Sequence, residues 1–383
     1  MKRIIYLFDE DDKYGAPKAG IEMIMQLKNK DIYPIILTSK KNNINKFCDD
    51  NNIENYVTYH HKYTYVNTKN KLKDIIKFIP RYLRYKLGNI IALNIIKRKI
   101  NLKNIDCIHS NISAIDLGIL ISKKYNIKNI MHIREFGELD FNMKSYRNNY
   151  IKYLNKNVTQ FIAISDAIRK YWIEKGISEN KIQTIYDGVY INDILTKENY
   201  RQKGKLKILM IGSINRKKGQ VELVKAISLL DDDIKNNILV DIIGNGYKYE
   251  EDLLKKEIEC NKLTHVITYK NYDSQIREKI KDYDIGVNCS FSEGFGRVTI
   301  EYMIAGLCVI ASNTGANIEI VNHNENGLLY EKGKPQTLSD AIKYLFNNYN
   351  EIMRLSENAK STVNQKFTIE INANNVNSLY DKI

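Results

Sequence analysis

Proline and cysteine are scarce in this 383-residue chain, which contains four prolines and five cysteines. The cysteines are odd in number and scattered, and no two of them form a C-x-x-C pair. A disulfide framework or a zinc site needs matched, closely spaced partners, so neither is supported. Reduced, isolated cysteines are typical of a cytosolic protein, and a cytoplasmic location is therefore expected.

Long apolar runs are also missing, and no stretch approaches the ~20 residues of a membrane-spanning helix. The first apolar run, residues 4–8, meets acidic residues almost at once. It is too short for a signal peptide and fits a buried strand. No G-x-G-x-x-G motif follows a strand, which disfavours a dinucleotide oxidoreductase. We expect a soluble protein of another class.

Short apolar runs alternate with longer amphipathic stretches along the whole chain, as is typical of β-α units around parallel sheets. The length allows two domains, and a second series of units starts abruptly at residue 207. A polar stretch between residues 186 and 205 is interpreted as the linker. Strands are predicted at 4–8, 33–38, 107–109, 130–133, 161–165, 207–212, 239–244, 266–269, 285–288 and 308–312, and helices at 16–30, 114–125, 166–175, 220–230 and 250–261.

The pattern therefore predicts an α/β fold with two Rossmann-like, doubly wound domains facing across a cleft. The first domain is expected at residues 1–190, completed by a C-terminal helix at 369–383, and the second at 191–368. Ligands of open α/β sheets bind beyond the carboxyl ends of the strands, so the site is expected between the domains.

The formal charge of +14 belongs entirely to the first half of the chain. Residues 1–190 hold 33 Lys and Arg against 19 Asp and Glu, while the remainder holds 26 of each. Residues 69–103 alone hold eleven basic residues and one acidic residue, interleaved with apolar and aromatic ones. Such a segment is typical of docking to an anionic membrane surface, at about 1 kcal/mol per well-placed cation. One alternative is a helical insertion whose lysines face water; nucleic-acid binding is disfavoured because no recognition motif accompanies the charge.

The most informative motif is SFSEGFGRVTIE at residues 290–301, which follows a predicted strand and opens a predicted helix. Gly294 and Gly296 would let the backbone approach a ligand, and the helix N-terminus offers N–H donors to a phosphate. Glu293 and Glu301 bracket these donors about 10 Å apart if the stretch is mostly helical, enough to straddle a diphosphate. Carboxylates suit sugar and ribose hydroxyls because they accept several hydrogen bonds.

Three other glycine turns lie at strand ends in the same half. Residues 212–219 combine Gly212 with Arg216, Lys217 and Lys218, a cluster suited to a pyrophosphate. Residues 241–246 and 306–319 contain the other two turns. Each turn alone has an ordinary structural explanation, but four of them in one predicted domain, together with spaced carboxylates, indicate a ligand site.

With these motifs the second half resembles the donor domain of the group 1 (family 4) retaining glycosyltransferases, which share the GT-B fold. The family's E-x7-E pattern matches residues 293–310, with departures at three packing positions, Tyr302, Ile304 and Cys308. The resemblance is strong over residues 207–333 and weak elsewhere. Lys218 matches the family's phosphate-binding lysine. The family's arginine is replaced by Ser213, so Arg216 or Lys217 is expected to take its role.

The resemblance implies a role for each matched residue. Glu301 should hold the nucleotide ribose, and Glu293 the transferred sugar. Lys218, with Arg216, should neutralise charge that builds on the leaving diphosphate, usually the largest catalytic effect. Neither a cofactor nor a divalent metal is expected. Backbone amides should contact the sugar at Gly294, Phe295 and Gly296, and the phosphates at Val298 and Thr299.

The motifs of the first half are fainter. Gly15 and Ala16 fall where the family has a glycine loop after its first strand, and they should present amides to the donor phosphate. His132, at a predicted strand end, resembles the family histidine that faces the donor sugar, although a structural histidine is the alternative without that match. Residues 161–165 and 186–189 match framework landmarks of the family. His60, His61 and His109 are interpreted as surface or packing residues.

The sequence thus predicts a retaining glycosyltransferase that moves a sugar from a nucleotide-sugar donor, expected to be UDP-linked, onto a saccharide acceptor that is expected to be lipid-linked. Surface polysaccharide biosynthesis at the inner face of the cell membrane would fit the basic first half. Two alternatives are kept open: a nucleotide-sugar epimerase of the same fold, which the E-x7-E pattern disfavours, and a non-catalytic nucleotide- or lipid-binding module. Retention of both glutamates, Lys218 and His132 speaks against the latter.

Overall fold

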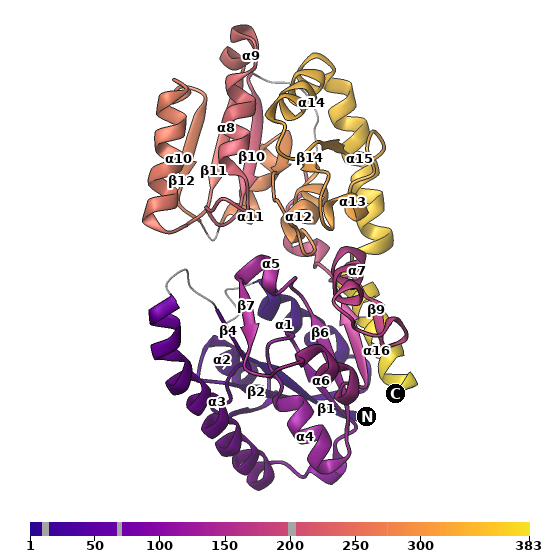
Figure 1. The fold of residues 1–383 in the computed structure, drawn as a ribbon. Coiled ribbons are helices and arrows are strands. Elements are labelled where there is room, and N and C mark those ends of the chain that lie inside the picture. The colour runs from indigo at the N-terminus through magenta and orange to yellow at the C-terminus, as the bar shows by residue number, and fades with distance from the viewer. Residues whose placement is uncertain (10–14, 67–70, 198–203, 274) are drawn as a thin grey trace. The chain divides into compact units, whose positions relative to one another are not determined.

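The computed structural model describes residues 1–9, 15–66, 71–197, 204–273 and 275–383. Residues 69–70 of the basic segment and 198–203 of the expected linker lie outside the described residues. The chain forms two compact units, each treated by itself (Figure 1). Unit 1 comprises residues 1–188 and 369–383, and unit 2 comprises residues 189–368.

Unit 1 is built on a seven-stranded parallel sheet. The order across the sheet is β3 (Glu54–Val57), β2 (Ile32–Thr38), β1 (Lys2–Phe8), β5 (Cys107–Ser110), β6 (Lys128–Ile133), β8 (Gln160–Ala163) and β9 (Ile182–Thr184). The chain winds outward from β1 in one direction and then from β5 in the other. The carboxyl ends of β1 and β5 therefore mark the switch point, where ligands bind in open α/β sheets.

Helices and one antiparallel ribbon, β4 (Thr64–Val66) with β7 (Met143–Ser145), complete unit 1. The short apolar runs form the inner strands, because helices cover both faces of the sheet. The C-terminal helix α16 returns to this unit and packs against α1. The helices are α1 (Gly15–Lys28), α2 (Asn43–Asp50), α3 (Lys71–Lys99), α4 (Leu117–Tyr125), α5 (Glu138–Phe141), α6 (Tyr150–Asn157), α7 (Asp166–Glu174) and α16 (Ile369–Lys382), with 3-10 turns at Leu102–Asn104 and Glu179–Lys181.

Unit 2 is built on a six-stranded parallel sheet with the same winding. Its order is β12 (Ile267–Lys270), β11 (Ile238–Ile243), β10 (Leu206–Ile211), β13 (Ile285–Asn288), β14 (Cys308–Ser312) and β15 (Leu328–Tyr330). The switch point lies between β10 and β13. The helices are α8 (Gln220–Ser228), α9 (Asp232–Asn236), α10 (Lys248–Cys260), α11 (Ile276–Lys279), α12 (Arg297–Ala305), α13 (Asn317–Ile320), α14 (Pro335–Asn347) and α15 (Tyr349–Lys366), with 3-10 turns at Ile191–Asp193 and Ile280–Asp282.

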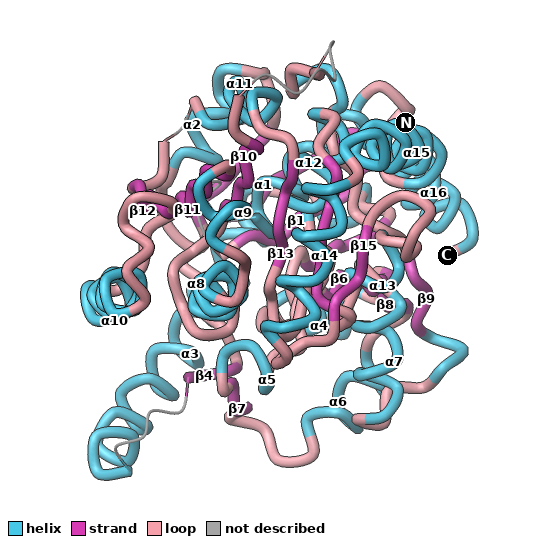
Figure 2. The backbone as a smooth tube through the Cα atoms, turned by 90° about the horizontal axis from the view of Figure 1, so that it is seen from above, coloured by secondary structure: helices cyan, strands magenta, loops and turns pink. Residues whose placement is uncertain are grey.

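The basic segment forms one long helix, α3, at the outer edge of unit 1 in two views (Figures 1 and 2). Its inward side chains, Tyr85, Ala92 and Ile96, are buried. No helix in the described part of the chain is long and apolar enough to cross a membrane.

Several predicted boundaries differ from the structure by one to three residues, and two of the differences have a local reason. The helix predicted at 114–125 starts only at Leu117, because the carbonyl of Ala114 accepts a hydrogen bond from the Tyr63 amide instead. The strand predicted at 161–165 ends at Ala163, because Ser165 caps α7 through its hydroxyl. The helix predicted at 16–30 ends at Lys28, two residues short.

Candidate functional site

Two loops meet at the switch point of unit 2. Residues 212–219 follow β10, and residues 289–296 follow β13. The amide of Phe291 donates to the carbonyl of Lys217 at 2.7 Å. Gly219 has a left-handed φ of 76°, and a Cβ there would lie 2.3 Å from the Cys289 carbonyl oxygen. Only glycine therefore lets the two loops approach this closely.

Lys218 and Glu293 form an ion pair between these loops, with the ammonium 2.9 Å from Oε2. The same oxygen accepts hydrogen bonds from the Ser290 hydroxyl at 2.7 Å and from the Asn288 amide at 3.5 Å. The Glu293 side chain is 12% exposed and that of Lys218 is 33% exposed. Sequence analysis predicted both residues, and the structure brings them into direct contact.

The charge state of Glu293 follows from these contacts. Burial on its own would raise the pKa of the carboxyl, but the Lys218 ammonium and the hydrogen bonds from Ser290, Lys218 and Asn288 outweigh it. The net result is a pKa below the ordinary value. At neutral pH Glu293 is therefore an anion held in a nearly dry position, able to accept hydrogen bonds but poorly suited to donate a proton.

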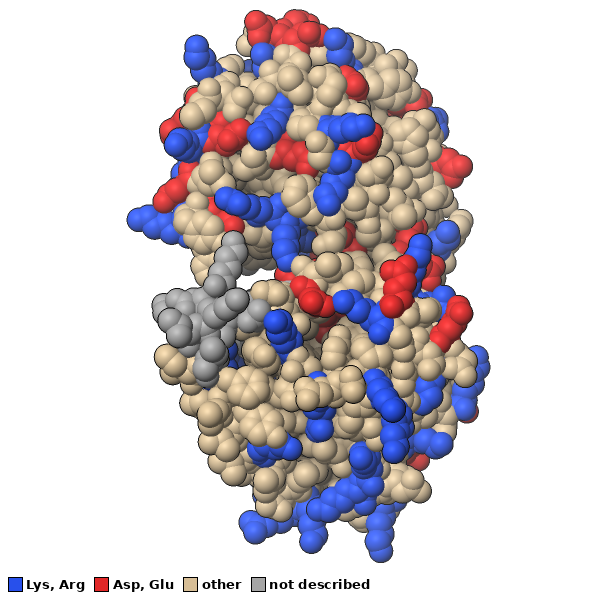
Figure 3. Space-filling view, viewed as in Figure 1, with Lys and Arg blue, Asp and Glu red and all other residues tan. Residues whose placement is uncertain are grey.

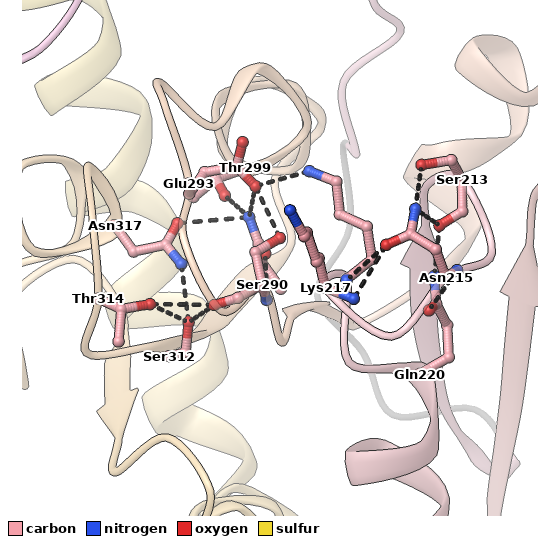
Figure 4. A network of polar contacts seen from close by, with 12 residues as sticks. Ser213, Asn215, Lys217, Gln220, Ser290, Glu293, Thr299, Ser312, Thr314 and Asn317 are labelled. Atoms are coloured by element: carbon pink, nitrogen blue, oxygen red, sulfur yellow. Dashed lines mark hydrogen bonds and ion pairs between the residues drawn. The ribbon is translucent and has the colours of Figure 1, made fainter. Parts of the chain in front are cut away.

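A buried polar network surrounds and fixes the loop that carries Glu293 (Figure 4). The Asn288 amide donates to Thr299 Oγ1 at 2.8 Å and to Asn317 Oδ1 at 3.3 Å. The carbonyl of Ser290 accepts hydrogen bonds from the hydroxyls of Ser312 and Thr314. Such satisfied networks make one loop geometry much more stable than its alternatives.

The glycine turn after β14 supports Glu293 directly. The amide of Ala316 donates to the Glu293 carbonyl at 2.9 Å. A Cβ at Gly315, whose φ is 55°, would lie 2.4 Å from that carbonyl oxygen. This turn, read from the sequence as a possible ligand contact, holds the Glu293 backbone.

Helix α12 starts directly after this loop, with Gly296 in a left-handed conformation at its N-cap. The Thr299 amide donates to the Gly296 carbonyl at 2.9 Å, so this predicted phosphate donor already has a partner within the turn. The Phe295 side chain is buried against Phe367, with ring centroids 5.9 Å apart. Only the backbone amide of Phe295 is therefore available for the predicted contact with the sugar.

Glu301 lies on α12, eight positions after Glu293 in the sequence. It forms an ion pair with Arg277 of α11. The Glu301 side chain is 13% exposed and that of Arg277 is 24% exposed, so both are reachable from solvent. Only Oε1 is engaged in this pair. The guanidinium therefore fixes the carboxylate orientation.

Arg216 and Lys218 have different surroundings. It lines a cavity of about 350 Å³ together with Gln220 of α8 and Glu250 of α10, and neither Lys218 nor Glu293 lines that cavity. The amides of Lys217 and Lys218 both donate to Asn215 Oδ1, which shapes the loop between Gly212 and the helix. Of the predicted basic residues, Lys218 is the one in contact with Glu293.

In unit 1 His132 ends up fully buried at the end of β6. Its Nδ1 lies 3.2 Å from His109 Nε2 and 3.3 Å from Arg134 Nη2, while its Nε2 has no hydrogen-bond partner in the described chain. Burial first, and then Arg134 and His109, hold the pKa of His132 well below its ordinary value. The ring is therefore neutral at physiological pH.

Arg134 links the two predicted elements of unit 1. Its Nε donates to Asn111 Oδ1 at 3.1 Å, and the Asn111 amide donates to the Ala16 carbonyl at 3.1 Å. Its Nη1 contacts both carboxylate oxygens of Asp187. Both residues are buried, with Arg134 7% and Asp187 5% exposed. Ala16 and His132 are thus joined through Asn111 and Arg134 around the switch point, next to Gly15 at the start of α1.

Sequence analysis missed several members of these networks. Asn288 and Asn317 could have been noticed as polar residues at or near buried strand ends. Nothing local identified Arg277 as a partner of Glu301. His109 was interpreted as a surface or packing residue; it is buried, as a packing residue is, but its two ring-nitrogen contacts were not foreseen. In the described ranges no three His, Cys, Asp or Glu side chains are grouped for metal binding.

Two family models match the chain. The model "Glycosyl transferases group 1" matches residues 192–362, and "Glycosyltransferase Family 4" matches residues 56–193. An uncharacterised glycosyltransferase of Methanocaldococcus jannaschii, MJ1178, is 29% identical over 315 residues, or 81% of this chain and 85% of its own. CapM of Staphylococcus aureus, named a capsular polysaccharide biosynthesis glycosyltransferase, is 22% identical over 61% of this chain and 65% of its own.

Among solved structures, Anabaena HepE in complex with UDP superposes with a TM-score of 0.80 over the full length of both chains, at 17% identity. This likeness concerns the fold, which is the GT-B fold. Taken together, the matched models cover residues 56–362, and the chain belongs to the group 1, family 4 glycosyltransferases.

Proposed function

We propose that this protein is a retaining glycosyltransferase that transfers a sugar from a UDP-linked donor to a saccharide acceptor without a divalent metal. The observation that carries the proposal is the Lys218–Glu293 ion pair at the start of α12, with Glu301 further along the same helix. A cation and two carboxylates around a helix N-terminus suit a diphosphate that carries hydroxyl-rich groups at both ends. The complexes of HepE with UDP and with UDP-glucose support this choice of donor.

In this proposal each residue has a defined task. Glu301, oriented by Arg277, accepts hydrogen bonds from the ribose hydroxyls. Glu293 accepts hydrogen bonds from hydroxyls of the transferred sugar, helped by amides of Gly294, Phe295 and Gly296. Lys218 is close enough to solvent to turn toward the diphosphate, and the amide of Val298 at the first turn of α12 is assigned to the same group, whereas the Thr299 amide is already used within the turn.

The reaction breaks the bond between the anomeric carbon and the β-phosphate oxygen and forms a bond from that carbon to the acceptor oxygen on the same face. The leaving diphosphate takes the electron pair, and one of its oxygens takes the acceptor proton. Fixed charges that stabilise this leaving group supply the main rate enhancement. Before the donor binds, Glu293 is an anion, because Lys218 and its hydrogen-bond donors hold its pKa below the ordinary value.

We further propose that the acceptor is lipid-linked and that α3 docks on the anionic inner face of the cell membrane. The outward side of α3 is apolar: Ile79, Leu83 and Leu87 are 65%, 51% and 58% exposed. They recur at helical spacing on the side opposite Tyr85, Ala92 and Ile96. Basic residues flank this stripe, and blue side chains predominate over red on the face of unit 1 seen in Figure 3. An apolar stripe between cations matches the headgroup boundary of an anionic bilayer.

A role in surface polysaccharide biosynthesis follows from these parts and is supported by the name of CapM. The decisive experiment incubates the purified chain with a panel of UDP-, GDP- and other nucleotide sugars in EDTA. Thermal shift identifies the donor, because a ligand at 100 times its Kd should add about 2.7 kcal/mol of stability. Transfer to membrane-extracted saccharide acceptors, with the anomeric configuration of the product read by NMR, then tests the reaction. A product with inverted configuration would refute the retaining mechanism. An epimerised donor without transfer would refute the transferase reaction, and activity that requires a metal would refute metal independence.

A further inference from the structure

Helices α8 and α10 lie side by side in unit 2 (Figure 1). A cavity of about 350 Å³ lies beside the N-terminal halves of both helices. Ligand pockets measure about 300–1,000 Å³, so this volume suffices for a small molecule. The cavity wall has a large apolar part, formed by Ile214, Val221, Leu253, Leu254, Phe291 and Pro335. Because neither Lys218 nor Glu293 lines it, the cavity is separate from their ion pair.

Charged groups of both signs also line this cavity. Arg216 and Lys225 contribute cations, Glu222 and Glu250 contribute carboxyl groups, and Gln220 contributes an amide. Two cations facing two carboxyl groups give no net field that would select an anion or a cation. A purely apolar ligand would leave these polar groups without partners, which costs free energy. The wall therefore suits an uncharged ligand that both donates and accepts hydrogen bonds.

Two exposed tyrosines extend this surface beyond the cavity. Tyr247 and Tyr249, just before Glu250 in the sequence, are 77% and 63% exposed. Their rings are nearly parallel, with an angle of 10° between the planes and centroids 6.1 Å apart. Hydrogen bonding to Glu250 raises the pKa of Tyr249, while the charge of Arg216 acts in the opposite direction. Tyr249 therefore lies beside two residues of the cavity wall, and the pair offers exposed aromatic area next to it.

A saccharide combines the features that this surface recognises. Its hydroxyls donate and accept hydrogen bonds, and the C–H groups on the face of a sugar ring pack against the electron-rich face of an aromatic ring. We propose that the cavity and the Tyr247–Tyr249 pair form a second saccharide site, which binds an uncharged oligosaccharide independently of the nucleotide-sugar donor. That this oligosaccharide belongs to the glycan on which the enzyme acts rests on the proposed function.

Saccharide binding is measured first, on the full chain without donor. The probes are maltose, lactose and N,N′-diacetylchitobiose, with glucuronic acid as an anionic comparison, and saturation-transfer NMR detects their contact with the protein. We expect at least one disaccharide to bind, more tightly than glucuronic acid, and to remain bound when UDP is saturating. Stronger binding of glucuronic acid, displacement of the disaccharide by UDP, or no binding of any disaccharide would overturn the proposal.

Leu253→Trp tests the cavity, because it places a larger side chain on the wall. This variant should lose saccharide binding. Leu229→Trp is the matched control: it adds the same ring at an exposed position of unit 2 that does not line the cavity, so it should bind saccharide as the parent does. The Kd for UDP should stay within about twofold in both variants, because separate sites act independently. A folded Leu253→Trp variant that binds no UDP would make the cavity part of the donor site and overturn the proposal.

A double variant, Tyr247→Ala with Tyr249→Ala, tests the tyrosine pair and should fold normally because both side chains are exposed. Its affinity for the disaccharide should fall roughly tenfold. Tyr344→Ala, which removes an exposed tyrosine of α14 outside the cavity, should not weaken binding. Parent-like binding in both the double variant and Leu253→Trp would overturn the site. A chain that binds the disaccharide as expected but transfers no sugar would contradict the proposed function and leave the saccharide site standing.

Discussion

The ammonium of Lys218 lies 2.9 Å from Oε2 of Glu293, although 75 positions separate the two residues in the sequence. Neighbouring loops at the switch point of one sheet make this contact possible. The pair keeps Glu293 ionised in a buried position and keeps Lys218 beside the start of α12. A diphosphate entering there would share the cation with Glu293, so binding and charge state at this point are coupled.

Glu293→Gln preserves the shape of the side chain and removes its charge. We expect the transfer rate to fall by roughly 10²–10³, because the lost interaction acts on the reacting sugar. Affinity for UDP should stay within about threefold, because the nucleotide is held elsewhere. Stopped assays of transfer and calorimetric titration of UDP measure the two quantities. A rate equal to that of the unmodified protein would remove Glu293 from the proposed mechanism.

Glu301→Ala should weaken donor binding roughly 100-fold, because the ribose hydroxyls lose a charged acceptor and hydrogen bonds to charged groups contribute about 1.5–3 kcal/mol each. Arg277→Ala should raise the Kd for UDP roughly tenfold by releasing the Glu301 carboxylate, and the double variant should bind no worse than Glu301→Ala alone. Calorimetry on the four proteins completes the cycle. Additive effects would mean that Arg277 acts independently of Glu301, and unchanged affinity in Glu301→Ala would refute its assignment.

Asp187→Ala leaves the buried guanidinium of Arg134 without its counter-ion. Breaking a buried pair from one side costs about 3–5 kcal/mol, so the unfolding free energy should drop by that order. Urea denaturation followed by circular dichroism measures it. Asp187→Asn keeps a hydrogen-bond acceptor and is the control, so its unfolding free energy should drop by less. Equal unfolding free energies of the parent protein and both variants would contradict this prediction.

Acid should destabilise the protein through its buried histidines, and His60 allows this to be measured away from the site. Burial lowers the pKa of His60 to about 4. Below about pH 6.5, the ordinary pKa of histidine, His60 binds a proton in the unfolded chain but not in the folded one. The stability of the folded state therefore falls as the pH drops from about 6.5 to about 4. His60 alone should cost about 1 kcal/mol between about pH 7.5 and 5.5.

His60→Gln removes this titration and keeps a polar group beside Thr58. The unfolding free energy of the variant should therefore depend less steeply on pH than that of the parent, by about the same 1 kcal/mol over this interval. Parallel pH profiles would show that His60 is protonated equally in both states.

Membrane docking predicts that the chain sediments with vesicles containing phosphatidylglycerol and is released by salt, which screens the basic flanks. Replacing Ile79, Leu83 and Leu87 by Ser should reduce the bound fraction at least tenfold, because each buried apolar side chain contributes about 1.5–3 kcal/mol. The matched control replaces three exposed apolar residues of unit 2, Leu229, Leu239 and Ile318. Equal loss in both triple variants, or no dependence on anionic lipid, would exclude docking through α3.

Local sequence patterns predicted most of the inner strands and several residues of the candidate site. Buried strands appear as apolar runs because parallel strands are covered on both faces, and the cores of β1, β10, β13 and β14 follow from that pattern. Gly296 and Glu293 were recognisable because a glycine before a helix and a carboxylate in a glycine loop are signals carried by consecutive residues. Strand ends and short edge strands such as β9 and β15 were less predictable, since their pairing depends on distant neighbours.

The sequence by itself determined the winding of two α/β units, the motifs at their strand ends and the residue types available for binding. Only the tertiary structure decided that Arg277 pairs with Glu301, that Arg216 lines a cavity which Lys218 does not line, and that Tyr380 contacts His109. The reason is physical: periodicity and turn chemistry act over a few residues, whereas the partner of a buried polar group is selected by desolvation and geometry across the whole fold.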